Sequence, residues 1–266
     1  MTGAEKHKQE PLFAEERKQR IIKLLNENTK LIVPDLCEYF GVSPATIRND
    51  LRELENSGLL KRTHGGAILN TKMGYELNSY QKEVKNLEAK QAIARFAINL
   101  VEDGDTIAID TGTTTLEFAK LLGSKKGITA VVNDIEIARK LEENSDVCVI
   151  LAGGILRRNF HCTIGPIAQR ALDGLSVDKA FMGANGVSIK RGLTTPDLNQ
   201  AEIKKAMMDI ASEVIVLCDS SKIGSVTFAQ IAPLERVDRL ITDHGADENE
   251  IQQFKDIGVQ VDIIKI

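Results

Sequence analysis

The sequence predicts two domains of different class: a small, mainly helical domain, followed by a larger α/β domain with a mostly parallel sheet. Its 266 residues exceed the usual length of one domain, about 150 residues, which favours two. Up to residue 69 the apolar residues recur with a helical period and then form two short strand-like runs. From Leu87 onward short apolar runs alternate with amphipathic helices, which is typical of a parallel sheet covered on both faces.

Composition argues against several classes of protein. The chain is 42% hydrophobic and 27% charged, which is the balance of an ordinary globular protein. Its four cysteines stand alone without CxxC pairs, so we expect a reducing cytoplasmic location, no disulfide scaffold and no metal site. No apolar run approaches about 18 residues and the polar N-terminus has no signal-peptide core, so we expect neither a membrane span nor secretion. We also expect no cofactor.

The first helices are predicted from apolar spacing and from helix-ending residues. A helical period begins at Glu15, with Arg17 on the outer side of its apolar stripe. A second, short helix is expected over 34–40, with a proline in its first turn, where the missing N–H costs nothing. Gly41 ends that helix, and Ser43 is expected to cap the next one.

Two short strands, over 59–63 and 67–69, are predicted to form a hairpin around His64-Gly65-Gly66. Helix, short helix, glycine turn, helix and hairpin is the order of a winged helix-turn-helix, which reads DNA with its second turn-linked helix. The alternative is a small helical packing module with a solvated polar face.

The helix that starts after Ser43 has the residue types of a DNA reader. Its apolar stripe, Ile47, Leu51 and Leu54, turns inward and leaves polar side chains outside. Arginine reads guanine, asparagine reads adenine, and alanine or a threonine methyl packs on thymine. Ser43 and the first amides suit a backbone phosphate, and the basic residues of the hairpin suit either the adjacent backbone or the minor groove. The predicted DNA-binding residues are Ser43, Ala45, Thr46, Arg48, Asn49, Arg52, Lys61, Arg62 and His64.

Net charge adds a constraint on this reader. Residues 1–75 carry only +2, and the remainder of the chain carries −6. A reader with so little positive charge must obtain affinity from a few placed residues and from pairing with a second reader. We therefore expect a homo-oligomer, a dimer or a tetramer, bound to double-stranded operator DNA.

The two predicted domains are separated by polar, weakly periodic residues, and the second domain consists of predicted strands that alternate with helices. The predicted strands of the second domain are 106–110, 128–132, 147–152, 179–184, 214–219, 239–243 and 259–266. The predicted organisation is a flexible tail over 1–14, the winged helix-turn-helix domain over 15–69, a linker over 70–86 and the α/β domain over 87–266.

The loop after the first of these strands suits an anion. Residues 111–115 read Thr-Gly-Thr-Thr-Thr between a strand and a helix, so backbone amides and hydroxyls meet the positive end of that helix. This chemistry suits a phosphate monoester. The alternative is a tight turn with threonine caps. The Gly-Lys-Ser/Thr ending of a P-loop and the GxGxxG pattern are absent from the sequence, which disfavours nucleotide hydrolysis.

Polar and glycine residues follow the other strands, and in an open α/β sheet the carboxyl ends of strands form the ligand site. We expect Asp110, Asn133 and Asn185 to bind hydroxyl groups and Lys222 to bind the phosphate. Asp134 has the same opportunity, but a strand-ending turn explains it better. Either Arg157 or Arg158 reaches the anion, or both are solvated.

These motifs resemble a known family. The run GVSPATIRNDLRELENSG followed by RTHGGA is similar to the DeoR-type family of bacterial sugar-catabolism repressors. DTGTTT, VND, AGG, GANGV, GLTT and DSSK resemble its sensor domain, which is similar to ribose-5-phosphate isomerase and related sugar-phosphate folds. The sequence departs from the family at Asn49, where a second arginine is more usual, and at Ile32, where a serine helix cap is common.

The resemblance implies that a phosphorylated sugar binds the second domain and relieves operator binding. The effector-binding residues expected from the strand ends and the resemblance are Asp110, Thr111, Gly112, Thr113, Thr114, Thr115, Asn133, Gly153, Gly154, Arg157, Asn185, Thr194, Glu202, Lys205 and Lys222.

The rival hypothesis is a sugar-phosphate isomerase with an accessory DNA-binding arm. Isomerisation needs a carboxylate base. Asn185 stands where the isomerases have an aspartate-rich segment, and an amide cannot act as that base. Glu202 remains a candidate base, but ligand binding or a salt bridge to Lys204 or Lys205 explains it better. We therefore expect no catalytic residue.

Overall fold

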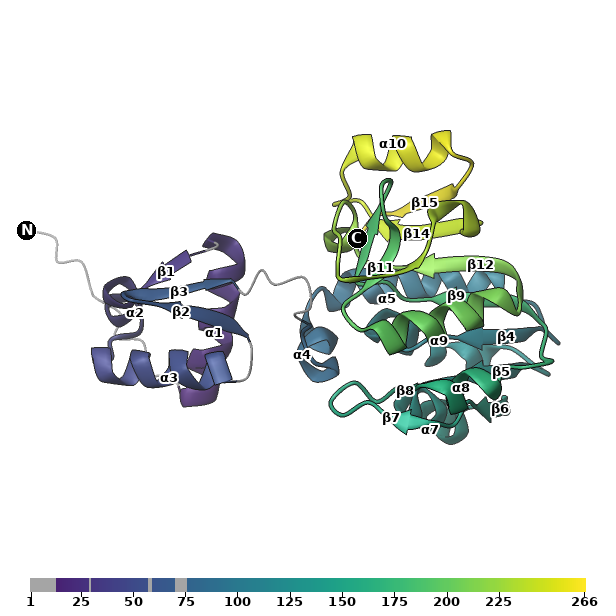
Figure 1. Ribbon diagram of the computed structural model, residues 1–266, viewed down its shortest axis with the longest axis horizontal. Helices are drawn as coiled ribbons and strands as arrows, with labels where there is room; N and C mark the ends of the chain where they lie inside the picture. Colours follow the sequence, from purple (N-terminus) through teal and green to yellow (C-terminus); the bar gives the residue numbers. More distant parts are fainter. Residues whose placement is uncertain (1–12, 29, 57–58, 70–75) are drawn as a thin grey trace, which may run out of the picture. The chain divides into compact units, whose positions relative to one another are not determined.

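The computed structural model describes residues 13–28, 30–56, 59–69 and 76–266. The chain forms two compact units, Met1–Tyr75 and Glu76–Ile266 (Figure 1). The tail predicted over 1–14 lies outside the described residues except for Phe13 and Ala14, and Ala14 is already helical. Among the described residues, none of the helices has the length and apolar character needed to cross a membrane.

Three helices begin the first unit. They are α1 (Ala14–Asn28), α2 (Val33–Phe40) and α3 (Pro44–Asn56), so the three predicted helices are confirmed. Ile32 precedes α2 without a side-chain cap, and Gly41 ends it with a left-handed φ of 64°. The helices share one apolar core, formed by Ile21, Leu25, Val33, Leu36, Ile47, Leu51, Leu54, Leu60 and Ala67.

A three-stranded antiparallel sheet completes this unit. The predicted hairpin is present as β2 (Leu60–Thr63) and β3 (Gly66–Leu69), and β1 (Lys30–Ile32) pairs with the other side of β3. Strand β1 was not predicted, because a run of three residues shows no period of its own. Gly66 is required at this pairing, since a Cβ there would lie 1.9 Å from the carbonyl oxygen of Leu31.

A buried ion pair joins α1 to α3. Arg17 Nε donates to Asp50 Oδ2 at 2.6 Å and Arg17 Nη2 donates to Asp50 Oδ1 at 3.1 Å. The prediction that Arg17 lies on the outer side of α1 is therefore wrong, because the carboxylate of Asp50 compensates the charge inside the core. The two-point contact fixes the orientation of α3 relative to α1.

Seven strands form the central sheet of the second unit. All neighbouring pairs are parallel, in the order β15-β14-β12-β9-β4-β5-β6, which confirms the seven predicted strands. Their bounds are β4 Thr106–Ile109, β5 Thr129–Val132, β6 Cys148–Leu151, β9 Val177–Met182, β12 Ala211–Leu217, β14 Arg239–Asp243 and β15 Gln260–Ile264.

Helices cover both faces of this sheet (Figure 1). Alternate strand residues point to opposite faces. Ile107 and Ile109 of β4 enter one core with α5 to α7, whereas Ala108 enters the other core with α8 to α10. The helices are α4 Ser79–Val84, α5 Leu87–Ala97, α6 Thr113–Ala119, α7 Ile135–Asn144, α8 Pro166–Arg170, α9 Leu198–Asp209 and α10 Glu248–Asp256.

Two small antiparallel additions were not predicted. β10 (Gly186–Ser188), β11 (Gly192–Thr195) and β13 (Ala229–Ala232) form a three-stranded sheet, and β7 (Ile155–Leu156) pairs with β8 (Thr163–Ile164). Each run is only two to four residues long. Runs this short show no pattern in the sequence, and pairing with neighbouring strands stabilises them.

The segment predicted as a linker, 70–86, is folded in its second part. Residues 70–75 lie outside the described residues, and the chain from Glu76 on belongs to the second unit. Within this part Asn78 and Gln81 form a reciprocal capping box at the start of α4. The linker prediction therefore fails for 76–86, because polar contacts rather than an apolar stripe hold this part in place.

The Arg17–Asp50 pair leads to a prediction about the first unit. Asp50→Ala leaves the guanidinium without its main partner, so we expect the free energy of unfolding of this unit to fall by about 2–3 kcal/mol. Hydrogen exchange of α1 and α3 peptides across a urea series measures it. Glu38→Ala, which removes an exposed carboxylate from α2, is the control and should change stability by less than about 0.5 kcal/mol. Equal effects of the two substitutions would contradict the role of the pair.

Candidate functional site

The outward face of α3 carries side chains predicted to read DNA. The helix buries Ile47, Asp50, Leu51 and Leu54. It exposes Ala45, Arg48, Asn49 and Arg52, and Thr46 is half-buried. Within the described part of the chain, the side chains of Arg48 and Arg52 form no hydrogen bond or ion pair, so both guanidinium groups are free for a partner.

Other predicted readers already have partners. Ser43 caps α3: its Oγ accepts the amide of Thr46 at 3.2 Å and lies 2.9 Å from the Thr46 hydroxyl. Asn49 Nδ2 donates to Glu53 Oε1 at 3.0 Å. Ser43 therefore fixes the first turn of the helix, and Asn49 must exchange an internal hydrogen bond before it can read a base.

The hairpin offers two exposed basic side chains, Lys61 and His64. Arg62 is different, because its backbone amide donates to Glu55 Oε1 at 2.8 Å and its Nε lies 3.8 Å from Glu55 Oε2. Arg62 therefore ties the hairpin to α3, while Lys61 and His64 point to solvent.

In the second unit, Asp110 follows β4 and forms a fully buried ion pair with Lys204 of α9. Asp110 Oδ2 also accepts the amide of Gly183 at 3.0 Å, and Lys204 Nζ donates to the carbonyl oxygen of Gly183 at 3.0 Å. Burial raises the pKa of Asp110, and the charge of Lys204 opposes that rise. The contacts among Asp110, Gly183 and Lys204 thus hold together the ends of β4 and β9 and helix α9.

The Gly/Thr loop after Asp110 is held by its own hydroxyls. The amide of Thr111 donates to Asn133 Oδ1 at 2.9 Å, and its hydroxyl donates to Asp134 Oδ2 at 2.5 Å. The hydroxyl of Thr115 donates to the carbonyl oxygen of Asp110 at 2.6 Å. Asp134 also caps α7. These contacts bring the ends of β4 and β5 together, as predicted from the parallel sheet.

Several polar groups of this loop region face no protein partner. Gly112 precedes α6 without a side-chain cap, so the first amides of the helix, from Thr113 on, have no partner within it. Asp110 Oδ1 and Asn133 Nδ2 are buried and have no hydrogen-bond partner among the described residues. Because buried polar atoms are nearly always paired, these donors and this acceptor suit a bound polar ligand.

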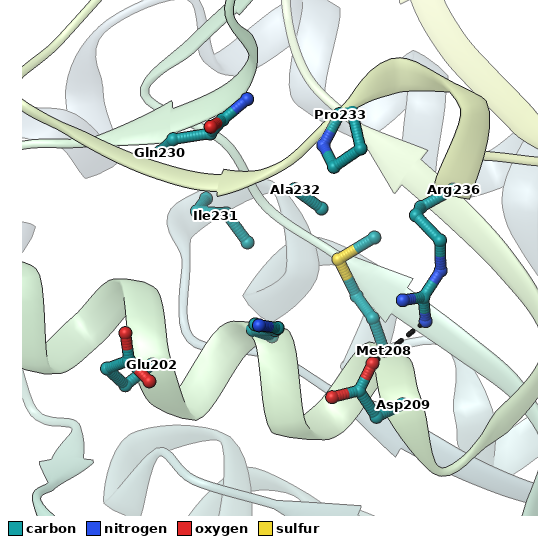
Figure 2. Close-up of a pocket in the computed structure, with 9 residues that line it drawn as sticks. Glu202, Met208, Asp209, Gln230, Ile231, Ala232, Pro233 and Arg236 are labelled. Carbon is teal, nitrogen blue, oxygen red and sulfur yellow. Dashed lines mark hydrogen bonds and ion pairs between the residues drawn. The ribbon is translucent and has the colours of Figure 1, made fainter.

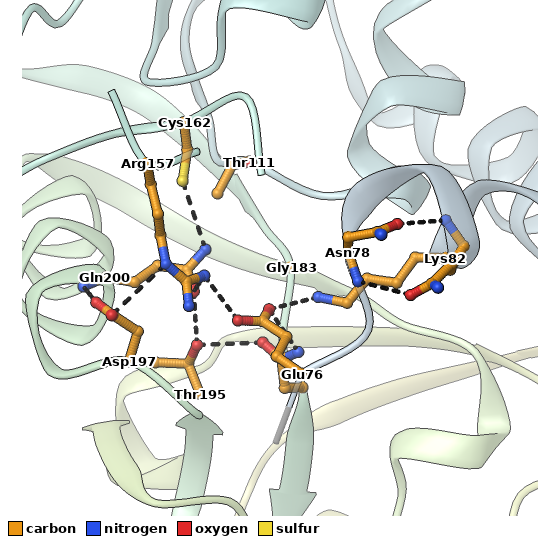
Figure 3. A network of polar contacts seen from close by, with 12 residues as sticks. Glu76, Asn78, Lys82, Thr111, Arg157, Cys162, Gly183, Thr195, Asp197 and Gln200 are labelled. Carbon is orange, nitrogen blue, oxygen red and sulfur yellow. Dashed lines mark hydrogen bonds and ion pairs between the residues drawn. The ribbon is translucent and has the colours of Figure 1, made fainter. Parts of the chain in front are cut away.

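Beside this loop lies a network centred on Glu76 (Figure 3). The Glu76 side chain is only 3% exposed. Its Oε2 accepts from Arg157 Nη1 at 2.6 Å, and its Oε1 accepts from Lys82 Nζ at 2.5 Å and from Asn185 Nδ2 at 3.1 Å. The structure thus brings together two predicted effector residues, Arg157 and Asn185, on one carboxylate.

Arg157 is held from several sides. Its Nη1 donates to Gln200 Oε1 at 3.3 Å, and its Nε lies 3.5 Å from Asp197 Oδ2. The guanidinium also stacks over the ring of Phe160, 3.8 Å from the centroid. Of the two alternatives for Arg157, a solvated surface arginine is therefore excluded.

Lysines surround the same corner of the unit. Burial lowers the pKa of Lys90 to about 8, with Asp219 opposing and Lys222 adding to the fall. Burial also lowers the pKa of Lys82 and Lys85, and Lys222 contributes to both shifts. Besides burial, the charge of Lys222 disfavours the charged form of all three lysines, and this added positive charge favours an anionic ligand.

Two further predicted effector residues, Thr194 and Gly154, take structural positions. Thr194 is buried, and its hydroxyl donates to the carbonyl oxygen of Gly186 at 3.3 Å. Gly153 and Gly154 are exposed between β6 and β7. Gly154 has φ 148°, and a Cβ there would lie 2.8 Å from the carbonyl oxygen of Ile164. Close packing accounts for this glycine without a ligand.

Glu202 and Lys205 lie elsewhere. Both are exposed on α9 and line a separate pocket with β13 and Arg236 (Figure 2). Lys204 and Gln200, four residues apart on the same helix, are buried on the face toward Asp110 and Arg157. The structure thus does not bring Glu202 and Lys205 together with the other predicted effector residues, because helical periodicity turns them to another face.

Four residues of the site were not predicted from the sequence: Glu76, Lys82, Gln200 and Lys204. Lys204 was detectable, since the apolar stripe of α9, with Ala201 and Met208, places position 204 on the inward face. Glu76 and Lys82 gave no such signal, because their segment is polar and lacks a period.

Comparison with known proteins matches both units. Residues 17–73 match the family model for the DeoR-like helix-turn-helix domain, and residues 85–244 match that for the DeoR C-terminal sensor domain. The chain is 39% identical over 246 residues to the HTH-type transcriptional regulator GlpR of Haloferax volcanii, covering 92% of this chain and 96% of the relative. It is 34% identical over 252 residues to the HTH-type transcriptional regulator GolR of Listeria innocua, covering 95% of this chain and 99% of that relative.

Among solved structures, ribose 5-phosphate isomerase A of Methanocaldococcus jannaschii aligns with 52% of this chain and 55% of its own. The TM-score is 0.40 and the identity is 24%. This degree of likeness says nothing about activity.

The buried pair at the site leads to a second prediction. Lys204→Met leaves Asp110 buried without its counter-charge, so we expect the free energy of unfolding of the second unit to fall by about 3–5 kcal/mol. Urea unfolding followed by hydrogen exchange of β4 and β9 peptides measures the change. Lys205→Met, on the exposed face of the same helix, is the matched control and should stay within about 0.5 kcal/mol of the wild type. A similar loss of stability in both variants would show that substitution anywhere in α9 destabilises the unit, and that the ion pair is not the cause.

Proposed function

The chain belongs to the DeoR family of helix-turn-helix transcriptional regulators, and on that premise we propose that it represses a sugar-utilisation operon and is released from its operator by a phosphorylated sugar. The observation that carries the proposal is the exposed face of α3. The side chains of Arg48 and Arg52 lie there without internal partners, and the ion pair of Asp50 with Arg17 holds the opposite face of the helix. The protein acts in the cytoplasm, where its operator DNA lies.

The first unit supplies the DNA-reading part of this proposal. Arg48 and Arg52 are free for base edges or phosphates, and the Arg17–Asp50 pair fixes the helix that bears them. Residues 1–75 carry only +2, so a single reader binds weakly. A homo-oligomer with paired readers, on half-sites about one DNA turn (~34 Å) apart or a multiple of it, meets that need.

The second unit supplies the effector site. The open amides at the start of α6 and the lysines around Lys222 suit a phosphate. The unpaired atoms of Asp110 and Asn133 suit sugar hydroxyls, which both donate and accept. The combination favours a small phosphorylated polyol or sugar over a nucleotide.

The isomerase alternative is not favoured. Glu202, the predicted candidate base, lies on the exposed face of α9 and lines another pocket. The carboxylates that do lie at the site are paired, Asp110 with Lys204 and Glu76 with Arg157. The charges of Lys82 and Arg157 lower the pKa of Glu76, so its carboxylate is a poor proton acceptor at neutral pH. Turnover of ribose 5-phosphate or a hexose phosphate that is lost in Glu202→Gln would overturn this conclusion.

A gel shift on the DNA upstream of the gene, titrated with a panel of sugar phosphates, tests the proposed function. We expect retardation that one member of the panel abolishes. Absence of retardation at low salt would refute the DNA claim. Retardation that is indifferent to every phosphosugar would refute the effector claim.

For α3 we predict that Arg48→Ala weakens operator binding by about 1–3 kcal/mol, roughly 5- to 150-fold, if Arg48 forms a bidentate base contact. Fluorescence anisotropy with operator and with random DNA measures the change. Lys23→Ala, which removes an exposed charge from α1, is the control and should have little effect. An equal loss on random DNA would show that Arg48 contacts a phosphate instead.

For the effector site we predict that Lys222→Ala leaves operator affinity unchanged but raises the sugar-phosphate concentration needed for release by at least about tenfold, because one charge-assisted contact is lost. Lys222 is a better test than Asp110, whose replacement would also break the buried pair. Lys190→Ala, in the exposed turn between β10 and β11, is the control. Unaltered release by Lys222→Ala would place the phosphate elsewhere.

A further inference from the structure

Glu76 occupies an unusual position in the chain and in the fold. It directly follows residues 70–75, which connect the two units, and it is the first residue of the second unit. Its carboxylate is nevertheless almost fully buried among groups that come from three other places: Arg157 after β7, Asn185 after β9 and Lys82 of α4.

These three partners form an anion site of their own. The guanidinium of Arg157 is fixed by Asp197, Gln200 and the Phe160 ring, so it keeps its place whatever lies against it. Burial by itself would raise the pKa of Glu76, but the charges of Lys82 and Arg157 outweigh burial and lower it. The carboxylate therefore stays ionised and fills the site as an anion.

A phosphate monoester presents the same type of acceptor oxygens to these donors and carries a charge of about −1.5 to −2 at pH 7, against −1 for a carboxylate. Arginine binds both groups through the same planar set of N–H donors. The ammonium group of Lys222, which has no hydrogen bond or ion pair among the residues described by the structure, lies close enough to Lys82 to lower the pKa of Lys82. A phosphate in place of the carboxylate would gain from this extra positive charge.

We propose that Glu76 is a tethered competitor, which occupies the anion site when no effector is bound and is displaced by the phosphate of the effector. Displacement removes the buried contacts that hold Glu76 to the second unit. Glu76 is the first residue of the second unit, so its release frees the point at which the chain of the first unit joins the second unit. This inference rests on the proposed function, and it specifies how effector and operator compete: the effector favours the state in which Glu76 is free.

Binding of inorganic phosphate to the full-length protein tests the competition directly, without DNA. We expect Glu76→Gln to bind phosphate at least tenfold more tightly than the wild type in isothermal titration calorimetry, because its competitor has lost its charge. Glu88→Gln, an exposed carboxylate at the start of α5, is the matched control and should bind like the wild type. Unchanged affinity in Glu76→Gln overturns the proposal, and weaker affinity shows instead that Glu76 helps to bind the anion.

A second measurement needs no substitution, and so it decides the matter even if Glu76→Gln is poorly folded. On saturation of the wild type with phosphate, amide hydrogen exchange in the peptide over 76–84 should accelerate, since displacement frees Glu76 and the start of α4. Slower or unchanged exchange in this peptide overturns the proposal.

The operator assay separates this inference from the proposed function. If the wild type releases operator on addition of a sugar phosphate, Glu76→Gln should show a much smaller change in operator affinity on the same addition, and Glu88→Gln should respond normally. An equal response of Glu76→Gln refutes the role of Glu76 and leaves the proposed function standing. A wild type that binds no operator refutes the proposed function, whatever the phosphate titration shows.

Discussion

The ion pair between Asp110 and Lys204 lies where β4, β9 and α9 meet, and the geometry of the proposed effector site depends on it. Removal of two charges from water is costly, so such a pair is kept only where its contacts are complete. It fixes Gly183, two residues before Asn185, and the backbone of Asp110, on which the Thr115 hydroxyl closes the Gly/Thr loop. The donors that the loop offers to a ligand are therefore held in place before any ligand binds.

Electrostatic compensation explains why this site suits binding better than proton transfer. Each buried carboxylate near the lysines has a cation or a donor assigned to it: Asp110 has Lys204, Glu76 has Arg157, and Asp219 has Asn86 at 2.7 Å. The charge of Lys222 disfavours the charged forms of Lys82, Lys85 and Lys90, and an incoming anion opposes that effect. Such a site gains free energy from a negatively charged ligand without the need for a free base.

Periodic and topological features were predictable from the sequence, whereas the pairing of short strands and the tertiary ion pairs were not. The seven parallel strands and the helices α1 to α3 were predicted because apolar spacing alone identifies them, and strand ends such as Asp110 and Asn133 converge through topology. β1 and β10 escaped notice since their pairing partners define them. Glu202 and Lys205 were selected from the family resemblance, which does not say which face of α9 is buried. Glu76 sits in a polar segment where burial arises only from tertiary ion pairs.

The small number of unpaired cations on α3 and the β2–β3 hairpin affects how DNA binding should depend on ionic strength. On α3 and the hairpin, within the residues that the structure describes, Arg48, Arg52 and Lys61 are exposed without an internal partner, while Arg62 is tied to Glu55. A protein releases about 0.9 condensed counterions from duplex DNA for every phosphate that it neutralises. If each helix-turn-helix domain neutralises few phosphates, few counterions are released, so we expect the affinity of the proposed operator complex to fall only gently as the salt concentration rises.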